Sequence, residues 1–262
     1  MQEYRLKSLP TPLKRELKLK GLEIIEEKFK HRKSWLVYSV ERLEELLQGY
    51  GVSFEQQDVE ATGWEERWKD YLRDGWLTDS VYYCFDDKIF DDDRAVIRIN
   101  PALAFGTGSH ATTQIAARLM EGVVAKQKVL DIGTGSAILA ILASLKGAKS
   151  VYACDVDAVA INNARENVAL NGCENVHLWA GEVTSISTAL KPNVVVANII
   201  TSVLQPLHPF ILTLHPKYII YSGITEREGP DFIAALALKE YQPDDILHMD
   251  KWCGVRLKHV GL

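Results

Sequence analysis

Residues 128–140 have the sequence K-V-L-D-I-G-T-G-S-A-I-L-A, and this stretch decides the fold. Val129–Ile132 is a short apolar run, which is typical of a buried parallel strand. Gly133 and Gly135 follow at once, and glycine allows a tight turn and a close approach of the backbone to a ligand. The small and aliphatic residues from Ala137 to about Lys146 then predict a helix. A strand, a glycine turn and a helix in this order indicate a nucleotide-binding βα unit.

The residues around this turn narrow the class of nucleotide. Ile138 stands where a dinucleotide fingerprint has its third glycine, and no lysine follows as in a P-loop. Asp155 ends the next predicted strand, 22 residues after Gly133, where a carboxylate can accept hydrogen bonds from both ribose hydroxyls. The pattern D-x-G-x-G-S-x-I-L resembles motif I of the S-adenosylmethionine (SAM) methyltransferases, which implies SAM as the cofactor.

The composition is that of an ordinary soluble globular protein. The chain has 262 residues, of which 47% are hydrophobic and 25% are charged. This length allows one large or two small domains. The net charge of −5 argues against non-specific nucleic-acid binding, which requires a basic face, so we expect no direct contact with nucleic acid.

The cysteines and the N-terminus indicate a reducing, cytoplasmic location. The four cysteines, Cys84, Cys154, Cys173 and Cys253, form no C-x-x-C pair and have no zinc-site spacing. Cys154 lies in a predicted strand, where a free cysteine packs as a small hydrophobe. Met1–Arg5 opens no apolar segment, and no apolar run reaches 18 residues, so neither a secretory signal nor a membrane span is expected.

Residues 1–62 are predicted to form a small separate domain. Strands are expected at Glu3–Leu9, Gly21–Lys30, Ser34–Val40 and Val52–Val59, and helices at Pro12–Lys20 and Glu41–Gln48. The order β-α-β-β-α-β is the ferredoxin-like pattern. The charge-dense run Lys28–Lys33 is interpreted as a solvated hairpin rather than a binding patch.

Residues 63–76 are predicted to be a helical linker. Trp64, Trp68, Tyr71 and Leu72 have the spacing that puts them on one helical face. We favour a helix packed between two domains, and the alternative is an aromatic surface that binds substrate.

Two short strands and a loop are expected next. Val81–Phe85 and Ala95–Ile99 are predicted strands joined by the acidic turn Asp91–Asp93, which is interpreted as a solvated turn rather than a metal site. Ser109 or Thr112 is expected to cap the helix that follows.

From residue 128 onward, strands and helices alternate. Strands are expected at 128–132, 150–155, 175–180, 193–199 and 217–222, with helices between them, notably at 157–170 and 226–240. Alternation at this spacing predicts a parallel sheet covered on both faces. Strands near 245–249 and 252–259 have no helix between them, so they are expected to pair as a terminal hairpin with one antiparallel strand. The prediction is therefore an α/β fold with a seven-stranded sheet.

Four residues fall at or just after the carboxyl ends of these strands, where such sheets bind ligands: Gly133, Asp155, Glu182 and Asn198. Glu182 follows the third strand and is either an adenine contact or an exposed loop acid. Asn198 alone would be interpreted as a turn residue, but the shared edge favours a functional role.

Six stretches occur in an order that identifies a family. They are F-G-T-G-S-H-A-T-T at 105–113, D-I-G-T-G-S-A-I-L-A-I at 131–141, C-D-V-D at 154–157, V-V-V-A-N-I at 194–199, S-G-I at 222–224 and W-C at 252–253. Together they resemble the ribosomal protein L-eleven methyltransferase family, the PrmA type of class I SAM-dependent methyltransferase. The resemblance covers about residues 64–262 by motif and residues 1–62 in plan.

The resemblance implies a domain plan. Residues 1–62 would be a ferredoxin-like substrate-recognition domain, residues 63–76 a helical linker, and residues 77–262 a Rossmann-like SAM methyltransferase domain. The chain departs from the family's pattern in three ways. Ser109 and Ala111 replace a threonine and a proline of the loop, Ala137 stands where motif I usually has a third glycine, and the N-terminal unit is short.

The resemblance also implies site residues. Thr113, Gly133, Asp155 and Asn198 would contact SAM, and Phe105 and Thr107 would lie in the loop that covers it. Gly135 and Glu182 complete the expected cofactor site, and catalytic roles are expected for Asn198 and Thr107.

The implied activity is the transfer of methyl groups from SAM to lysine or N-terminal amines of a large-subunit ribosomal protein. A charged lysine must first lose a proton, and the Asn198 side-chain oxygen with nearby carbonyls would then hold the neutral amine. No dedicated base is evident, since His110 is better interpreted as a helix-start or loop-packing residue. The alternatives are methylation of another protein or a small amine, and a SAM-binding protein without catalysis.

Overall fold

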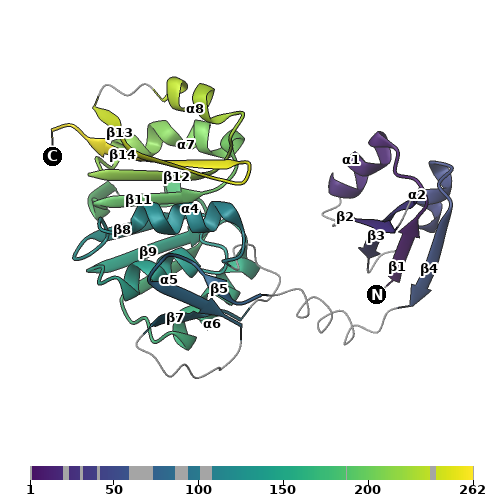
Figure 1. The fold of residues 1–262 in the computed structure, drawn as a ribbon, viewed down its shortest axis with the longest axis horizontal. Helices are drawn as coiled ribbons and strands as arrows, with labels where there is room; N and C mark the ends of the chain where they lie inside the picture. Colours follow the sequence, from purple (N-terminus) through teal and green to yellow (C-terminus); the bar gives the residue numbers. More distant parts are fainter. Residues whose placement is uncertain are drawn as a thin grey trace. The chain divides into compact units, whose positions relative to one another are not determined.

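The computed structural model describes residues 2–19, 24–29, 32–39, 42–58, 73–85, 94–100, 108–186, 188–236 and 240–261. The chain divides into two compact units, Met1–Leu72 and Arg73–Leu262 (Figure 1). Residues 63–72 of the linker helix predicted at 63–76 lie outside the described residues, but its predicted end is wrong, because Gly75–Trp76 form the strand β5. The predicted domain boundaries therefore stay a prediction.

The first unit is a four-stranded antiparallel sheet with two helices. Its elements are β1 (Gln2–Leu6), α1 (Thr11–Leu19), β2 (Ile24–Phe29), β3 (Arg32–Ser39), α2 (Glu44–Gly49) and β4 (Phe54–Asp58). The strands are ordered β2-β3-β1-β4, and each neighbouring pair is antiparallel. The element order predicted from the sequence is thus confirmed.

A small core of its own holds the first unit together. Fully buried Tyr4 and Leu6 of β1 pack with Leu13 and Leu17 of α1 and with Leu47 of α2. The Tyr4 hydroxyl accepts a hydrogen bond of 3.0 Å from the backbone N–H of Leu43, directly before α2. One strand therefore anchors both helices.

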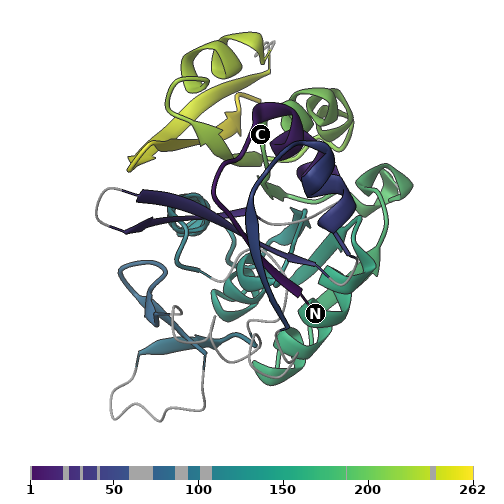
Figure 2. The same cartoon turned by 90° about the vertical axis from the view of Figure 1, so that its right-hand side faces the viewer.

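The second unit contains a seven-stranded, mostly parallel sheet. Its strands are β8 (Lys128–Ile132), β9 (Ser150–Asp155), β10 (Val176–Ala180), β11 (Val194–Asn198), β12 (Tyr218–Thr225), β13 (Tyr241–Met249) and β14 (Trp252–His259). They lie in the order β10-β9-β8-β11-β12-β14-β13. The strand β14 runs antiparallel to both of its neighbours, β12 and β13. Together β13 and β14 form a hairpin at the edge of the sheet, coloured yellow in Figures 1 and 2. The predicted α/β fold and its terminal hairpin are confirmed.

Helices cover both faces of this sheet. They are α4 (Ala111–Met120), α5 (Ile138–Leu145), α6 (Ala158–Leu170), α7 (Thr201–Thr213) and α8 (Gly229–Ala235). Side chains that alternate along each strand enter two separate cores, as expected for a strand buried on both sides. Val129 of β8 joins the core under α4, α5 and α6, whereas Leu130 joins the core under α7 and α8.

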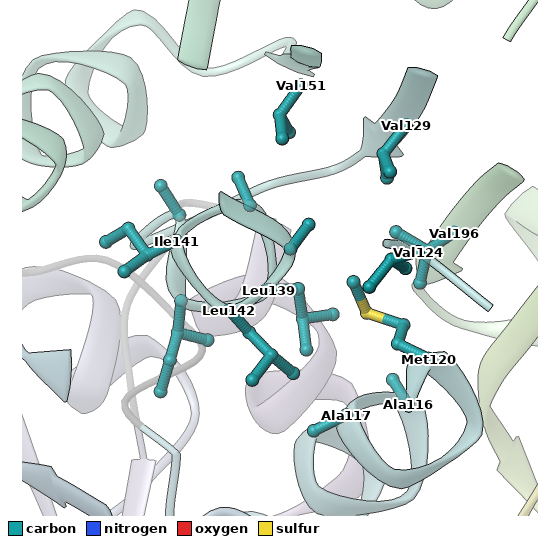
Figure 3. Close-up of a cluster of buried hydrophobic side chains, with 14 of the residues drawn as sticks. Ala116, Ala117, Met120, Val124, Val129, Leu139, Ile141, Leu142, Val151 and Val196 are labelled. Carbon is teal, nitrogen blue, oxygen red and sulfur yellow. The ribbon is translucent and has the colours of Figure 1, made fainter. Parts of the chain in front are cut away.

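The first of these cores is closely packed around two helices. In Figure 3 the side chains of α4 and α5 meet those of β8, β9 and β11 in a single cluster. Met120 of α4 and Leu139 of α5 lie beside Val196 of β11, and all three are at most 4% exposed. This packing fixes the two helices whose first turns border the carboxyl ends of the strands.

A small second sheet precedes α4. It contains β5 (Gly75–Trp76), β6 (Val81–Cys84) and β7 (Ala95–Arg98). The strands β6 and β7, which were predicted, run parallel and therefore need a crossover connection. The acidic turn predicted at Asp91–Asp93 stays a prediction. Residues 86–93 themselves lie outside the described part of the chain.

The four cysteines are all buried, and none of them is part of a disulfide bond. Cys154 is 1% exposed, as predicted for a small hydrophobe in a strand, and burial raises the pKa of its thiol to about 12. Among the described residues, no helix is long and apolar enough to cross a membrane.

Candidate functional site

A cavity of about 730 Å³ opens at the carboxyl ends of the parallel strands. Its wall includes six of the eight residues expected at the site: Thr113, Gly133, Gly135, Asp155, Glu182 and Asn198. Asp155 and Asn198 end β9 and β11, the loop residues follow β8 and β10, and Thr113 belongs to α4. They come together because the carboxyl ends of parallel strands meet at one edge of the sheet. The other two, Phe105 and Thr107, lie outside the described residues.

The turn between β8 and α5 forms the floor of the cavity through residues with positive φ. Gly133 and Gly135 have φ angles of +72° and +54°. A Cβ on Gly133 would lie 2.6 Å from Cγ2 of Ile199, so a side chain at 133 would press on this neighbouring residue of the cavity wall. Ala137, which replaces a motif glycine, also adopts a left-handed conformation, with φ +66°. Position 137 therefore has a backbone conformation that glycine adopts readily, although alanine occupies it.

Asp155 is bound to the same turn. Its Oδ2 accepts a hydrogen bond of 3.0 Å from the N–H of Gly135, and its Oδ1 accepts one of 3.0 Å from the N–H of Asp157. Each carboxylate oxygen can accept two hydrogen bonds, so both keep capacity for a ligand. The side chain lines the cavity and is half-buried. Its two backbone contacts hold the carboxylate in place before any ligand arrives.

A second carboxyl group lies below the turn, out of contact with solvent. Asp131 of β8 is 1% exposed, and its Oδ2 accepts a hydrogen bond of 2.6 Å from the Thr134 hydroxyl. Burial raises the pKa of Asp131 to about 7, the Thr134 hydrogen bond opposes this, and the nearby charge of Asp155 adds to it. Asp131 does not line the cavity, so we interpret it as support for the turn.

The side-chain amide of Asn198 uses its nitrogen in a hydrogen bond but not its oxygen. Its Nδ2 donates a hydrogen bond of 3.2 Å to Oγ1 of Thr113, a fully buried residue of α4. Its Oδ1 is buried and has no hydrogen-bond partner among the residues that the structure describes. A buried acceptor without a partner costs free energy, so it points to a ligand that supplies the missing donor.

The remaining wall is apolar and was not predicted from the sequence. It includes Val156 after β9, the N-cap residue Ile200 of α7, and Val203, Pro206 and Leu207 of α7 itself. Val156 is 75% exposed and Ile200 is 61% exposed, which is unusual for large apolar side chains. Val156 and Ile200 could have been found from the sequence, because each is an apolar residue just after a predicted strand end, where no core is available to bury it.

Two further residues can now be placed. Glu182 lines the cavity, and its Oε2 accepts a hydrogen bond of 3.1 Å from the Thr184 hydroxyl. His110 is the N-cap of α4, and its Nδ1 accepts a hydrogen bond from the N–H of Thr112. The expectation that Ser109 or Thr112 caps this helix is wrong, because Thr112 already lies inside the first turn and Ser109 precedes the cap. The helix-start role expected for His110 is confirmed.

Comparisons with known proteins agree on one family. The family described as "Ribosomal protein L11 methyltransferase (PrmA)" matches residues 6–259. A ribosomal protein L11 methyltransferase of Streptococcus uberis is 36% identical over 185 residues, covering 68% of this chain and 58% of that protein. One from Acetivibrio thermocellus is 33% identical over 210 residues, covering 77% and 66%. The matches thus span about three fifths of the relatives' length.

One solved structure is similar over most of its length. It is a ribosomal protein L11 methylase from Lactobacillus delbrueckii subsp. bulgaricus, which is 33% identical to this chain. The likeness covers 72% of this chain and 99% of that one, with a TM-score of 0.66.

Proposed function

Since the chain belongs to the ribosomal protein L11 methyltransferase (PrmA) family, we propose that it is a SAM-dependent N-methyltransferase of a large-subunit ribosomal protein. The methyl acceptors would be lysine or N-terminal amines. The observation that supports this proposal is the Oδ1 of Asn198, which lies at the cavity without a hydrogen-bond donor among the described residues. A primary amine can donate the missing hydrogen bond.

The cavity has the chemistry that SAM requires. The Asp155 carboxylate would accept the two ribose hydroxyls, and the glycine turn from 133 to 135 allows the ligand to approach the backbone. Apolar side chains such as Val156 and Val183 suit a flat adenine ring. When bound, SAM supplies an already activated methyl group on its sulfonium. The protein therefore has to position the acceptor more than to activate the methyl donor.

Asn198 would position the acceptor amine. Its Nδ2 is engaged by Thr113, so the amide cannot turn without losing that hydrogen bond, and Oδ1 stays available to an amine N–H. One N–H bound to Oδ1 aims the nitrogen lone pair in a fixed direction. Placement of reacting groups in this way can contribute on the order of 7–11 kcal/mol at best.

The acceptor amine must be neutral before it can react. A free lysine has a pKa of about 10.4 and is almost fully charged at neutral pH. The apolar wall of Ile200, Val203 and Leu207 disfavours the charged ammonium through desolvation, and Asn198 Oδ1 binds the neutral amine. The proton would leave to solvent as the amine enters, since the carboxylate of Asp155 would be occupied by the ribose hydroxyls of SAM.

The proposal is tested with isotope-labelled SAM and the full-length protein. Ribosomal proteins from cells lacking methylation of the large subunit serve as substrates, and mass spectrometry locates the labelled residues. We expect label on amines of one large-subunit protein. Label on an unrelated protein or a small amine would instead support the second candidate, which shares the cavity chemistry but not the substrate.

Replacement of Asn198 separates orientation of the amine from binding of SAM. We expect Asn198→Ala to lower kcat at least 10-fold, a change of about 1.4 kcal/mol, because the lost hydrogen bond acts mainly in the transition state. Asn198→Asp keeps an acceptor oxygen and should retain part of the activity. Unchanged kcat in Asn198→Ala, with only the KM for SAM raised, would make Asn198 a cofactor ligand alone.

A further inference from the structure

The S-G-I stretch at 222–224 is a motif that the cavity does not use directly. None of these three described residues belongs to the cavity wall. Ser222 of β12 is nevertheless fully buried, and it lies beside Asn198 of β11 in the parallel register of the two strands. The buried Ser222 hydroxyl is therefore close to the Asn198 side chain without being part of the cavity.

Ser222 joins the sheet to the first turn of α4. Its hydroxyl donates a hydrogen bond of 2.8 Å to the backbone carbonyl of Thr112. The next residue, Thr113, accepts the hydrogen bond from Asn198 Nδ2. The chain of contacts therefore starts on β12, passes through the start of α4 and returns to the end of β11.

The neighbouring glycine holds the other side of Asn198. Gly223 has a φ of +85°, and a Cβ there would lie 2.5 Å from the backbone oxygen of Ile199. Only glycine lets β12 approach the residue after Asn198 so closely. The pairing of β12 with β14 also shifts register between Tyr221 and Ile224, which marks a local irregularity.

We propose that Ser222 is a positioning residue for methyl transfer, which aims the free oxygen of Asn198 by fixing Thr113 through the carbonyl of Thr112. This inference rests on the proposed function of Asn198. Ser222 itself touches neither cofactor nor acceptor. Without its hydroxyl, the Thr112 carbonyl keeps the hydrogen bond of the helix itself, so the fold survives, while the first turn of α4 and the Asn198 amide gain freedom.

Kinetics of the full-length protein test the proposal against a matched control. We expect Ser222→Ala to lower kcat about 10-fold, as misplacement of a reacting group does, with less than about a 2-fold change in the Kd for SAM. The control is Ser144→Ala, which removes a hydroxyl that donates to Oδ1 of Asn175 away from the cavity wall. Ser144→Ala should keep the wild-type kcat although its melting temperature falls by about as much as that of Ser222→Ala. Equal kcat losses in the two variants would overturn the proposal.

A double variant identifies the residue through which Ser222 acts. We expect Ser222→Ala combined with Asn198→Ala to be no slower than Asn198→Ala alone, because Ser222 has nothing left to position. Ser222→Cys keeps a weak donor and should recover part of the kcat lost in Ser222→Ala. Multiplicative losses in the double variant, or no recovery in the cysteine variant, would overturn the role.

A spectroscopic readout separates this inference from the proposed function. The side-chain amide of Asn198 is assigned in NMR spectra from the signal missing in Asn198→Ala. We expect this signal to shift or broaden in Ser222→Ala and to stay unchanged in Ser144→Ala. An unaltered Asn198 signal in Ser222→Ala refutes the positioning contact whether or not methyl transfer occurs. If the Asn198 signal shifts in Ser222→Ala but the wild type transfers no methyl group to any ribosomal protein, the proposed function is refuted, whereas the positioning of Asn198 by Ser222 is supported.

Discussion

A few polar side chains give the cavity its chemistry, because most of its wall is apolar. Asp155 is held by the N–H groups of Gly135 and Asp157, and Asn198 is held by Thr113. Each functional group is thus held by the protein before a ligand binds, which lowers the cost of ordering it on binding.

Loss of the Asp155 carboxylate should weaken SAM binding. We expect Asp155→Ala to cost about 1.5–3 kcal/mol, or roughly 10- to 150-fold in affinity, as for a hydrogen bond to a charged group. Isothermal titration calorimetry measures the affinity. Asp157→Ala is the control, since Asp157 caps α6 through the N–H of Val159 and does not line the cavity. An unchanged SAM affinity in Asp155→Ala would remove Asp155 from the site.

The buried carboxyl of Asp131 should make stability depend on pH. Its pKa is raised to about 7, above the value of an unfolded aspartate, so the native state binds the extra proton between about pH 4 and 7. Stability from this group is therefore present below pH 4 and is lost as the pH rises to 7. Urea unfolding of wild type and Asp131→Asn should diverge across this window, with the wild type losing stability relative to the variant. Parallel curves would contradict the raised pKa.

At the residue scale, the position of a residue at a strand end was enough to predict which side chains lie together, whereas their roles stay a prediction. Gly133, Asp155 and Asn198 were expected at one edge because they end parallel strands, and all three line the cavity. The hydrogen bond between Thr113 and Asn198 joins residues 85 positions apart, and no sequence pattern encodes it. The cap of α4 was also missed, because histidine is an uncommon N-cap residue.

Among the elements, the turn from β8 to α5 depends on an unusual backbone conformation. Its residues at 133, 135 and 137 all have positive φ, and Gly133 and Gly135 line the cavity. Glycine adopts this conformation at little cost, whereas at Ala137 the surrounding packing has to hold it in place.

A matched pair of glycine substitutions tests this turn. Gly133 and Gly147 have similar φ angles, +72° and +80°, but a Cβ meets Ile199 at the first and no atom within 4 Å at the second. We expect Gly147→Ala to lose about 1–2 kcal/mol, the cost of the left-handed conformation alone. Gly133→Ala should lose more stability in thermal melts and should also lose SAM affinity. Equal losses in both variants would show that the contact with Ile199 is unimportant.

The sequence predicted elements well where burial gave a strong pattern. The predicted strands at 128–132 and 150–155 coincide with β8 and β9, since apolar residues fill both faces. The hairpin was harder, because β13 begins at Tyr241 and its first residues are mostly exposed and polar. The helix expected at 226–240 is only Gly229–Ala235, and residues 237–239 lie outside the described residues. The parallel pairing of β6 and β7 depends on a contact between segments that periodicity cannot reveal.

At the scale of the whole molecule, the two units have separate cores. Among the residues that the structure describes, the core of the first unit contains residues from 4 to 54, and the two cores of the second unit contain residues from 77 onward. A division of this kind could be predicted from the sequence, because the period-two strands of residues 1–62 differ from the βα alternation after residue 128. The extent of the linker depends on residues outside those described.

Separate cores predict separable activities. We expect a protein beginning at Arg73 to fold and to bind SAM with the affinity of the full-length chain, because every described residue of the cavity wall lies after residue 73. It should lose methyl transfer to the ribosomal protein, which the first unit would recognise. Calorimetry and transfer of labelled methyl groups measure the two properties. Full transfer activity in the shortened protein would contradict a recognition role for the first unit.

The free oxygen of Asn198 also bears on how many times one nitrogen is modified. A neutral primary amine offers this acceptor two hydrogens, and every methyl group that is added removes one of them. After two additions the nitrogen keeps its lone pair but has no hydrogen to donate. If Asn198 orients the amine as we propose, it would no longer hold the dimethylated nitrogen, and a third addition would depend on the shape of the apolar wall alone. The proposed contact would thus also distinguish the products by their degree of methylation.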